Sequence, residues 1–252
     1  MTLLGVLALA GCGEEKQPSD SITPPAVGEC RVLTPEDLKT TVNDTPTVPC
    51  GQQHTAETFF VGTFSDDADR DTIDEQVLGA QAFEKCQPVF TEFVGGDDSL
   101  VMRSTLTWAW YRPSERGWKD GARWLRCDVV GGGEQSDGFA PLPTTVEGVL
   151  LGRPDDRWMV CAKGADVDTA VRLPCAEKHN WRAVATVVLG RADDKYPGDK
   201  EVEAKTRAFC SDQVGAYLGY PVADYDFGFT WFGEGEWEAG NRRSICWAQT
   251  KK

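Results

Sequence analysis

Nine cysteines give this 252-residue chain its clearest capacity for chemistry. Cys12 stands alone, and the other eight fall into two groups of four: Cys30, Cys50, Cys86 and Cys127, then Cys161, Cys175, Cys210 and Cys246. No two of them have the C-x2-C or C-x4-C spacing that zinc sites usually contain. A cysteine nucleophile needs an unpaired thiolate beside a base. We therefore expect disulfides, with no metal and no catalytic cysteine.

Three pairings are open within each group of four cysteines. We favour first with second and third with fourth, which gives Cys30–Cys50, Cys86–Cys127, Cys161–Cys175 and Cys210–Cys246. The first bond of each group would tie neighbouring strands, and the second would tie a helix to the last strand. On the chain-entropy model each bond contributes roughly 3 to 4 kcal/mol to stability. That contribution matters for a unit of about 100 residues with a limited core.

The two histidines of the chain, His54 and His179, occupy equivalent positions. Each lies four residues after the cysteine of a Pro-Cys pair, at Cys50 and Cys175. Either could be a binding or proton-transfer group, but one histidine per unit lacks the partners of a catalytic triad or a metal site. The alternative, which we favour, is a structural histidine whose ring nitrogens bond to backbone or to a carboxylate near the disulfide.

A second motif, Trp-x2-Gly-x-Arg-x3-Cys, ends each half of the chain. Its candidate binding residues are Trp118, Arg123, Trp237 and Arg242, with Gly121 and Gly240 between them. They could form an aromatic and basic pocket for a glycan or peptide. They could also form a turn in which arginine stacks on tryptophan, which is the interpretation we favour. Aromatic residues of the adjacent hairpins would make the best binding surface if exposed: Trp108, Trp110, Tyr111, Phe229, Trp231 and Phe232.

These shared motifs indicate an internal duplication. Pro-Cys-x3-His precedes Trp-x2-Gly-x-Arg-x3-Cys in both halves, with the same spacing inside each motif. A stretch rich in glycine and proline separates the halves, which is typical of a linker. We assign residues 28–132 to repeat 1, 133–145 to a linker and 146–252 to repeat 2.

The pattern of elements predicts an α+β fold. It consists of two tandem disulfide-stabilised repeats, each a small antiparallel sheet with one packed helix in the order β-β-α-β-β. The first helix has a predicted apolar stripe of Ile73, Val77, Ala80, Phe83, Cys86, Phe90 and Phe93. Thr72 and Glu75 resemble a capping box, and Pro88 should kink this helix or end its regular part. In the second helix Asp199 is the predicted N-cap, and the stripe is Val202, Phe209, Val214 and Leu218.

The amino terminus resembles a bacterial lipoprotein signal. Residues 1–11 contain an apolar stretch, and Leu9-Ala10-Gly11-Cys12 is similar to a lipobox. This resemblance implies cleavage before Cys12, a lipid on its sulfur and a place on the extracytoplasmic face of the cell membrane. Residues 12–27 would then be a flexible tether. A plain secretory signal is the alternative, and the basic residues expected before the apolar stretch are missing.

Charge and motif content argue against several function classes. Asp and Glu number 40 against 26 Lys and Arg, a net charge of −14. Nucleic-acid binding needs clustered basic residues and is not expected. No apolar run reaches the roughly 18 residues of a membrane-spanning helix. No GxSxG, HExxH, Walker or GxGxxG motif occurs in its required context, so we expect no enzyme activity and no cofactor.

The order of the motifs resembles the septum formation-related domain of actinobacterial cell-envelope proteins, here in two tandem copies. The resemblance rests on Pro-Cys-x3-His, then a helix that carries a cysteine, then Trp-x2-Gly-x-Arg-x3-Cys, and it covers nearly all of the chain beyond residue 28. It implies a role around division-septum assembly and structural roles for the paired cysteines and the histidines. It brings no catalytic residues.

We therefore expect a membrane-anchored, non-catalytic binding or scaffold module of the cell envelope. Its expected partners are the membrane, through the lipid anchor, and envelope or division proteins or wall glycan. Two alternatives stay open. One is a cell-wall-acting enzyme that uses His54 or His179 with nearby carboxylates, and the other is a small-ligand receptor that uses the aromatic hairpins.

Overall fold

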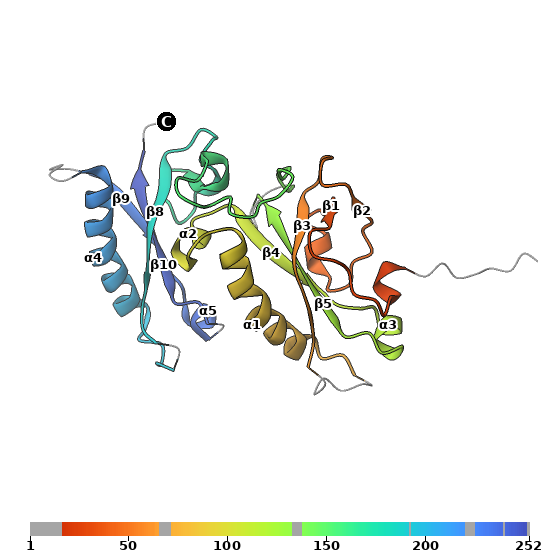
Figure 1. The fold of residues 1–252 in the computed structure, drawn as a ribbon. Coiled ribbons are helices and arrows are strands. Elements are labelled where there is room, and N and C mark those ends of the chain that lie inside the picture. The colour runs from red at the N-terminus through yellow and green to blue at the C-terminus, as the bar shows by residue number, and fades with distance from the viewer. Residues whose placement is uncertain are drawn as a thin grey trace, which may run out of the picture.

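Two five-stranded antiparallel sheets with the same strand order form the body of the protein (Figure 1). The computed structural model describes residues 17–65, 72–132, 138–191, 193–219, 225–238 and 240–250. Sheet 1 has the order β2-β1-β3-β5-β4, with β1 (Cys30–Arg31), β2 (Thr47–Val48), β3 (Ala56–Thr63), β4 (Leu106–Tyr111) and β5 (Trp124–Gly131). Sheet 2 has the order β7-β6-β8-β10-β9, with β6 (Val160–Lys163), β7 (Val171–Pro174), β8 (Trp181–Val188), β9 (Phe227–Thr230) and β10 (Arg243–Gln249).

The predicted α+β class and its repeated sheet-plus-helix unit are confirmed. Each sheet has five strands in the described ranges, rather than the four that the order β-β-α-β-β implies. The extra strand arises because both cysteines of the first disulfide lie in or next to short strands, so β1 pairs with both β2 and β3, and β6 with both β7 and β8. The central pairing also shifts register at the same place in both sheets, at Phe59 in β3 and Val184 in β8. Such a shared irregularity supports duplication of one unit.

One long helix packs against each sheet in the part of the chain that the structure describes: α1 (Glu75–Phe93) on sheet 1 and α4 (Asp199–Leu218) on sheet 2. The shorter helices are α2 (Asp98–Met102), α3 (Glu115–Lys119) and α5 (Glu234–Glu238), with 3-10 turns η1 (Pro18–Asp20), η2 (Asp37–Lys39) and η3 (Asp156–Trp158).

The two long helices begin differently from the sequence-based expectation. The Asp74 carboxylate accepts two backbone N–H groups of the first turn of α1, at 3.0 and 3.1 Å. Asp74 is therefore the N-cap, and the predicted capping box of Thr72 and Glu75 is wrong. The N-cap of α4 is Gly198, one residue before the predicted Asp199.

The buried stripe of α1 also differs from the predicted stripe. The residues that face the sheet recur every four positions: Leu78, Ala82, Cys86 and Phe90. Val77, Ala80 and Phe83 are exposed, Phe83 to 59 %, so their assignment to the core was wrong. The helix also continues through Pro88 instead of ending there. In α4 the same step of four buries Val202, Thr206, Cys210 and Val214, leaving Phe209 half-buried and Leu218 exposed.

Each repeat contains two disulfides, and their pairing is the one favoured from the sequence. Cys30–Cys50 joins β1 to the chain just after β2, and Cys161–Cys175 joins β6 to the residue just after β7, at the β2 and β7 edges of the sheets. Cys86–Cys127 joins α1 to β5, and Cys210–Cys246 joins α4 to β10. The four cysteines of these two helix-to-sheet bonds are fully buried. The bonds therefore fix which face of each helix meets its sheet.

The segment that leads into sheet 2 completes the core beside sheet 1. Val146, Leu150 and Trp158 are buried in one cluster with residues of α1 and β5. The Leu150 N–H also donates to the Val94 carbonyl just after α1, at 2.8 Å. Val146, Leu150 and Trp158, counted with repeat 2 by sequence, therefore lie on repeat 1 in space.

The two repeats are joined by backbone pairing at their junction. Ser104 forms an isolated antiparallel bridge with Met159. The Thr105 N–H donates to the Trp158 carbonyl and the Val160 N–H to the Arg103 carbonyl, each at 2.8 Å. The chain entering β4 is thus paired with the chain entering β6.

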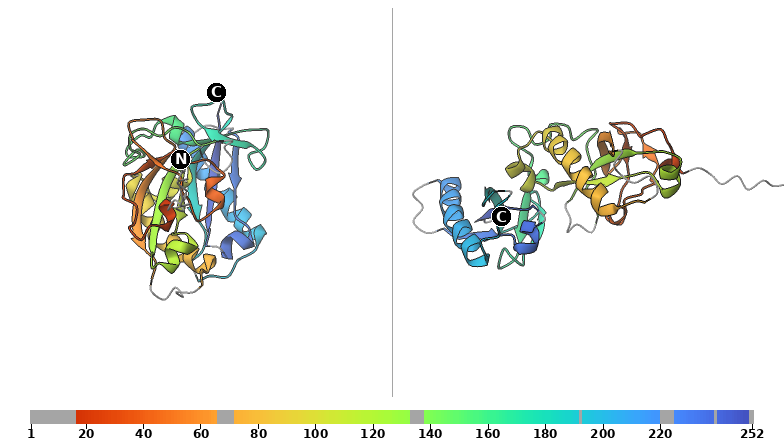
Figure 2. Two further views of the ribbon diagram at one scale, coloured as in Figure 1. Left: turned by 90° about the vertical axis from the view of Figure 1, so that its right-hand side faces the viewer. Right: turned by 90° about the horizontal axis from the view of Figure 1, so that it is seen from below.

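Helix α2 adds side-chain contacts across the same junction. Leu100 packs against the cluster around the Cys161–Cys175 disulfide, and Met102 packs on the face of sheet 2 opposite α4. Asp98 forms an ion pair with Arg243 of β10 at 3.2 Å. Figure 2 shows α2 at the place where the two repeats meet.

The chain before β1 forms an ordered arm over repeat 1, which corrects part of the predicted flexible tether 12–27. Ser19 is buried, and its N–H donates to the Asp44 carboxylate at 2.8 Å. The Ser19 carbonyl accepts from the Ser114 N–H at 2.9 Å, and the Ser21 carbonyl accepts from the Trp124 indole at 2.9 Å. The predicted signal (1–11) and Cys12 lie outside the described residues.

The layers alternate along the long direction of the molecule. From left to right in Figure 1 they are α4, sheet 2, α1 with α2, sheet 1 and the N-terminal arm. Helix α1 therefore has one face on its own sheet and the other directed toward sheet 2. The space between α1 and sheet 2 is where the two repeats can form a joint site.

Candidate binding site

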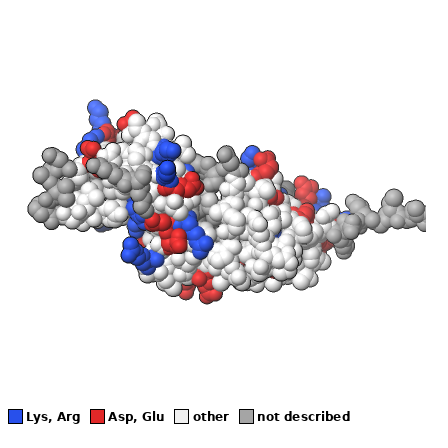
Figure 3. Space-filling view, turned by 90° about the horizontal axis from the view of Figure 1, so that it is seen from above, with Lys and Arg blue, Asp and Glu red and all other residues white. Residues whose placement is uncertain are grey.

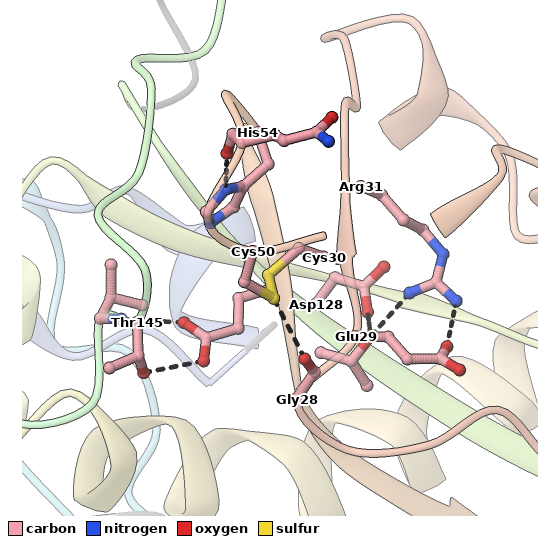
Figure 4. Close-up of a disulfide and its surroundings, with 12 residues drawn as sticks. Gly28, Glu29, Cys30, Arg31, Cys50, His54, Asp128 and Thr145 are labelled. Atoms are coloured by element: carbon pink, nitrogen blue, oxygen red, sulfur yellow. Dashed lines mark hydrogen bonds and ion pairs between the residues drawn. A yellow bond between two sulfur atoms is a disulfide. The ribbon is translucent and has the colours of Figure 1, made fainter. Parts of the chain in front are cut away.

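Both histidines are buried parts of a disulfide loop. His54 is fully buried and His179 is 3 % exposed. Nδ1 of each ring lies close to the carbonyl oxygen two residues earlier, at 2.8 Å from Gln52 and 2.7 Å from Glu177. A carbonyl can only accept, so Nδ1 carries the proton. Figure 4 shows His54 beside the Cys30–Cys50 disulfide, in a position that no substrate or ligand can reach without local opening.

The Trp-x2-Gly-x-Arg motifs form matching turns. The Arg123 guanidinium lies 4.1 Å from the centre of the Trp118 ring, and that of Arg242 lies 4.3 Å from the Trp237 ring. Both tryptophans are buried. Gly121 has φ +100° and its counterpart Gly240 has φ +96°, a conformation that residues with a Cβ rarely adopt. The geometry is that of the stacked turn rather than of an open aromatic pocket.

The aromatic residues of the hairpins divide into buried and accessible ones. Tyr111 and Phe232 belong to the core, whereas Trp231 is 36 % exposed. Trp108, Trp110 and Phe229 are half-buried. Of these six aromatic residues, only Trp108 lines the cleft described below.

A buried ionic cluster lies on the arm side of sheet 1. Asp128 is fully buried and forms an ion pair with Arg126 at 3.0 Å, although the pair lacks hydrogen-bond geometry. Thr58 donates to Asp128 at 2.7 Å and accepts from Arg31 at 2.8 Å. Figure 4 shows Arg31 and Asp128 close together. Burial lowers the pKa of Arg126, and the Asp128 carboxylate opposes that shift.

The cluster holds the segment between β1 and β2 in place and is absent from the equivalent face of repeat 2. Arg126 donates to the Asn43 amide oxygen of that segment at 2.9 Å. At the four matching positions repeat 2 has apolar residues that pack together: Ala162, Ala183, Ile245 and Trp247. The sequence contained this signal, since alignment of the two repeats places charged residues opposite apolar ones. All four residues of the cluster are buried, so we assign it a structural role.

The accessible candidate site is a cleft of about 770 Å³ between the two repeats. One wall consists of Phe83 and Gln87 of α1 with the Leu106–Trp108 part of β4. The opposite wall consists of Arg172 and Leu173 of β7 with residues of β10, and α2 contributes Val101 and Met102. Neither repeat could form this cleft alone, which explains why reasoning on single motifs did not find it.

An aromatic pair dominates the first wall. The Phe83 and Trp108 rings lie with their centres 6.2 Å apart. The Trp108 indole donates to the Gln87 side chain at 2.8 Å, which fixes the orientation of the ring. Phe83 stays 59 % exposed, so the pair offers an apolar contact surface that is already in position.

Charged groups surround the cleft. Its lining includes three arginines, Arg172, Arg242 and Arg243, and two carboxylates, Asp98 and Glu236. The lining thus carries an excess of one positive charge, in a chain with a net charge of −14. Seen from above, side chains of both signs gather over repeat 2 and the junction, whereas the visible face of repeat 1 is largely uncharged (Figure 3).

We expect His54→Ala and His179→Ala to lower the free energy of unfolding, each by about 2 kcal/mol, because a buried ring and its hydrogen bond are lost. Thermal denaturation of the variants measures this effect. Lys178→Ala, at an exposed neighbouring position, is the control and should change little. Unchanged melting temperatures for the histidine variants would contradict their structural role.

We expect Asp128→Ala to cost about 3 to 5 kcal/mol, because it leaves buried arginine charge without its partner. Combining Arg126→Ile with Asp128→Leu should cost less than Asp128→Ala alone, because no unpaired member of the pair remains. Denaturant unfolding measures both, with the exposed Glu36→Ala as control. A double variant less stable than Asp128→Ala would show that the pair itself stabilises repeat 1.

Two features are absent from the described ranges. No group of three or more His, Cys, Asp or Glu side chains is arranged to hold a metal ion there. None of the helices in those ranges combines the length and apolar character needed to cross a bilayer.

Comparison with known proteins identifies the family. No curated protein and no solved structure matches the chain. A family model described as Septum formation matches residues 27–246. This single match spans both repeats, although the sequence motifs suggested one copy of the family domain in each. It covers nearly the whole chain, and the protein belongs to the Septum formation family.

Proposed function

We propose that this protein is a non-catalytic binding module of the cell envelope with a role linked to division. In this proposal Cys12 carries the lipid anchor, and the cleft between the repeats binds a division or wall-synthesis protein. The observation that carries the proposal is the pair of exposed Phe83 and half-buried Trp108 inside a cleft that both repeats build. Exposed aromatic surface rimmed by charged groups is typical of protein interaction sites.

An extracytoplasmic location is supported by the cysteines. Disulfides persist in oxidising compartments and are rare in a reducing cytosol. Four bonds join eight of the nine cysteines of the chain. The ninth, Cys12, is the residue in the lipobox-like string. The ordered arm begins by residue 17, so only a short stretch of chain would separate the lipid from repeat 1.

A non-catalytic role is supported by where the histidines lie. The enzymatic alternative depends on His54 or His179 acting beside carboxylates. Both rings are buried, and each donates its Nδ1 proton to the backbone. A general base must come within hydrogen-bond reach of its substrate, and neither histidine lines the cleft.

We expect a photo-cross-linking amino acid at Phe83 to capture a division or wall-synthesis protein in the cells that produce the intact lipoprotein. Phe83 is exposed and lines the cleft, so the probe replaces an aromatic side chain at the contact surface. Mass spectrometry identifies the captured protein. Capture should fall several-fold when Arg172→Glu is added, because it reverses a charge in the opposite wall.

The matched control places the same probe at Tyr217, an exposed aromatic residue of α4 outside the cleft. Little capture is expected there. A Cys12→Ser variant should leave the membrane fraction and lose capture at Phe83. Equal capture at both positions, or capture of bulk membrane proteins only, would contradict the proposal.

A further inference from the structure

We infer that the partner in the cleft is an extended polypeptide segment that adds as a strand to the free edge of β4. This inference rests on the proposed function, because it names the form of the partner that the same cleft would hold. It commits to main-chain pairing, which distinguishes it from the docking of a folded surface or of a glycan.

The edge of β4 has a gap in its backbone pairing. β4 is the outermost strand of sheet 1 and pairs only with β5. Just before the strand, the Thr105 N–H is bonded to Trp158, and just after it the Arg112 N–H is bonded to Thr41. Between these two bonds, the backbone of Leu106–Tyr111 pairs with β5 alone among the described residues, so the opposite edge of the strand has no backbone partner. Six residues is a typical strand length, and an unpaired edge is a template for another strand.

The same edge already accepts an antiparallel strand at its beginning. Ser104 and Met159 form an antiparallel bridge directly before β4. The pairing stops there because the preceding residues turn away into η3 (Asp156–Trp158). An added segment would continue an interface that the protein itself has begun.

The side chains of β4 favour a partner strand with an apolar residue at every second position. Successive side chains of a strand point to opposite faces, so Leu106 and Trp108 share the face directed at α1, where both join the core beside sheet 1. Every second side chain of the added strand would meet this face and the exposed Phe83. Affinity would come from the main chain and selectivity from these alternate positions.

The opposite wall favours a carboxylate on the partner. Arg172 is exposed on β7 and lines the cleft, whereas Arg243 is paired with Asp98 at 3.2 Å. A segment with apolar residues at alternate positions and an acidic residue facing Arg172 therefore complements both walls.

The test uses the full-length chain in detergent and a phage-displayed library of random nonapeptides. Peptides enriched on the natural chain but not on Phe83→Ala are synthesised unmodified and in two N-methylated forms, with methyl groups on the odd or on the even backbone nitrogens. One methylated form should bind about 30- to 100-fold more weakly because it loses two or three hydrogen bonds to β4. The other form should change affinity by less than about threefold, since its blocked N–H groups point away from the edge.

Two further readouts accompany the peptides. Amide hydrogen exchange should slow at the β4 residues whose N–H groups face the free edge when the unmodified peptide is bound, because these groups become paired. Leu106 is left out of this readout, since its N–H already donates to the Ser104 hydroxyl at 3.3 Å. Arg172→Glu should lower the affinity for acidic peptides by about tenfold, because one close contact between opposite charges is lost. Lys163→Glu, exposed on the neighbouring β6 and outside the cleft lining, should have little effect.

Equal weakening by both methylation patterns, or unchanged exchange along β4, would overturn strand addition and leave the cleft as a binding site. Failure to enrich any peptide would also overturn it. The proposed function fails separately, when cross-linking from Phe83 captures no division or wall-synthesis protein.

Discussion

The arrangement of the two repeats depends on the insertion of Trp158 into the core beside sheet 1. Trp158 belongs to the chain that leads into sheet 2, yet it is 1 % exposed among residues of repeat 1. Its carbonyl also accepts the Thr105 N–H at the start of β4. Gly131 permits the close approach, since a Cβ there would lie 3.1 Å from the indole. Burying a large aromatic side chain contributes on the order of 3 kcal/mol, and here it positions sheet 2.

That constraint explains why duplicated units do not have equivalent surfaces. The helix face of repeat 1 is directed toward sheet 2, while the other face of sheet 1 is covered by the N-terminal arm. On the same face, the ionic cluster of Arg126 and Asp128 holds the segment between β1 and β2 through Asn43. Repeat 2 needs no such arm, because the equivalent face is packed by apolar residues and by Met102 of α2. The exposed side of α4 instead carries ion pairs between residues four apart, which suits a solvated end of a stack.

The parts of the fold that were predictable from sequence are those fixed by local spacing. The duplicated motifs gave the α+β class, and the positions of the cysteines relative to the expected strands and helices were enough to favour the observed pairing. The stripe of α1 was misassigned because Phe83 is apolar at a helical spacing, yet it serves a surface between repeats rather than the core. Periodicity cannot distinguish these two uses of an apolar residue.

The candidate site itself was not predictable from motifs. Its walls come from α1, β4, β7 and β10, which are far apart in the sequence and meet because Val146, Leu150 and Trp158 pack on repeat 1 and the chains entering β4 and β6 pair. The conspicuous residues, two histidines and two Trp–Arg pairs, are buried or stacked within single repeats, and of these only Arg242 lines the cleft. Spacing motifs report the scaffold of each repeat, whereas the binding surface arises from how the repeats are joined.

Because Trp158 is buried in the core beside sheet 1 and the chains entering β4 and β6 are paired, we expect the two repeats to tumble as one body with the cleft between them. Backbone ¹⁵N relaxation of the natural chain and of Trp158→Ala tests it most directly, because it reports the rotational tumbling of each sheet on the nanosecond scale. We predict one common tumbling time for sheets 1 and 2 in the natural chain and a shorter, separate time for sheet 2 in Trp158→Ala. Different tumbling times for the two sheets in the natural chain would contradict the account.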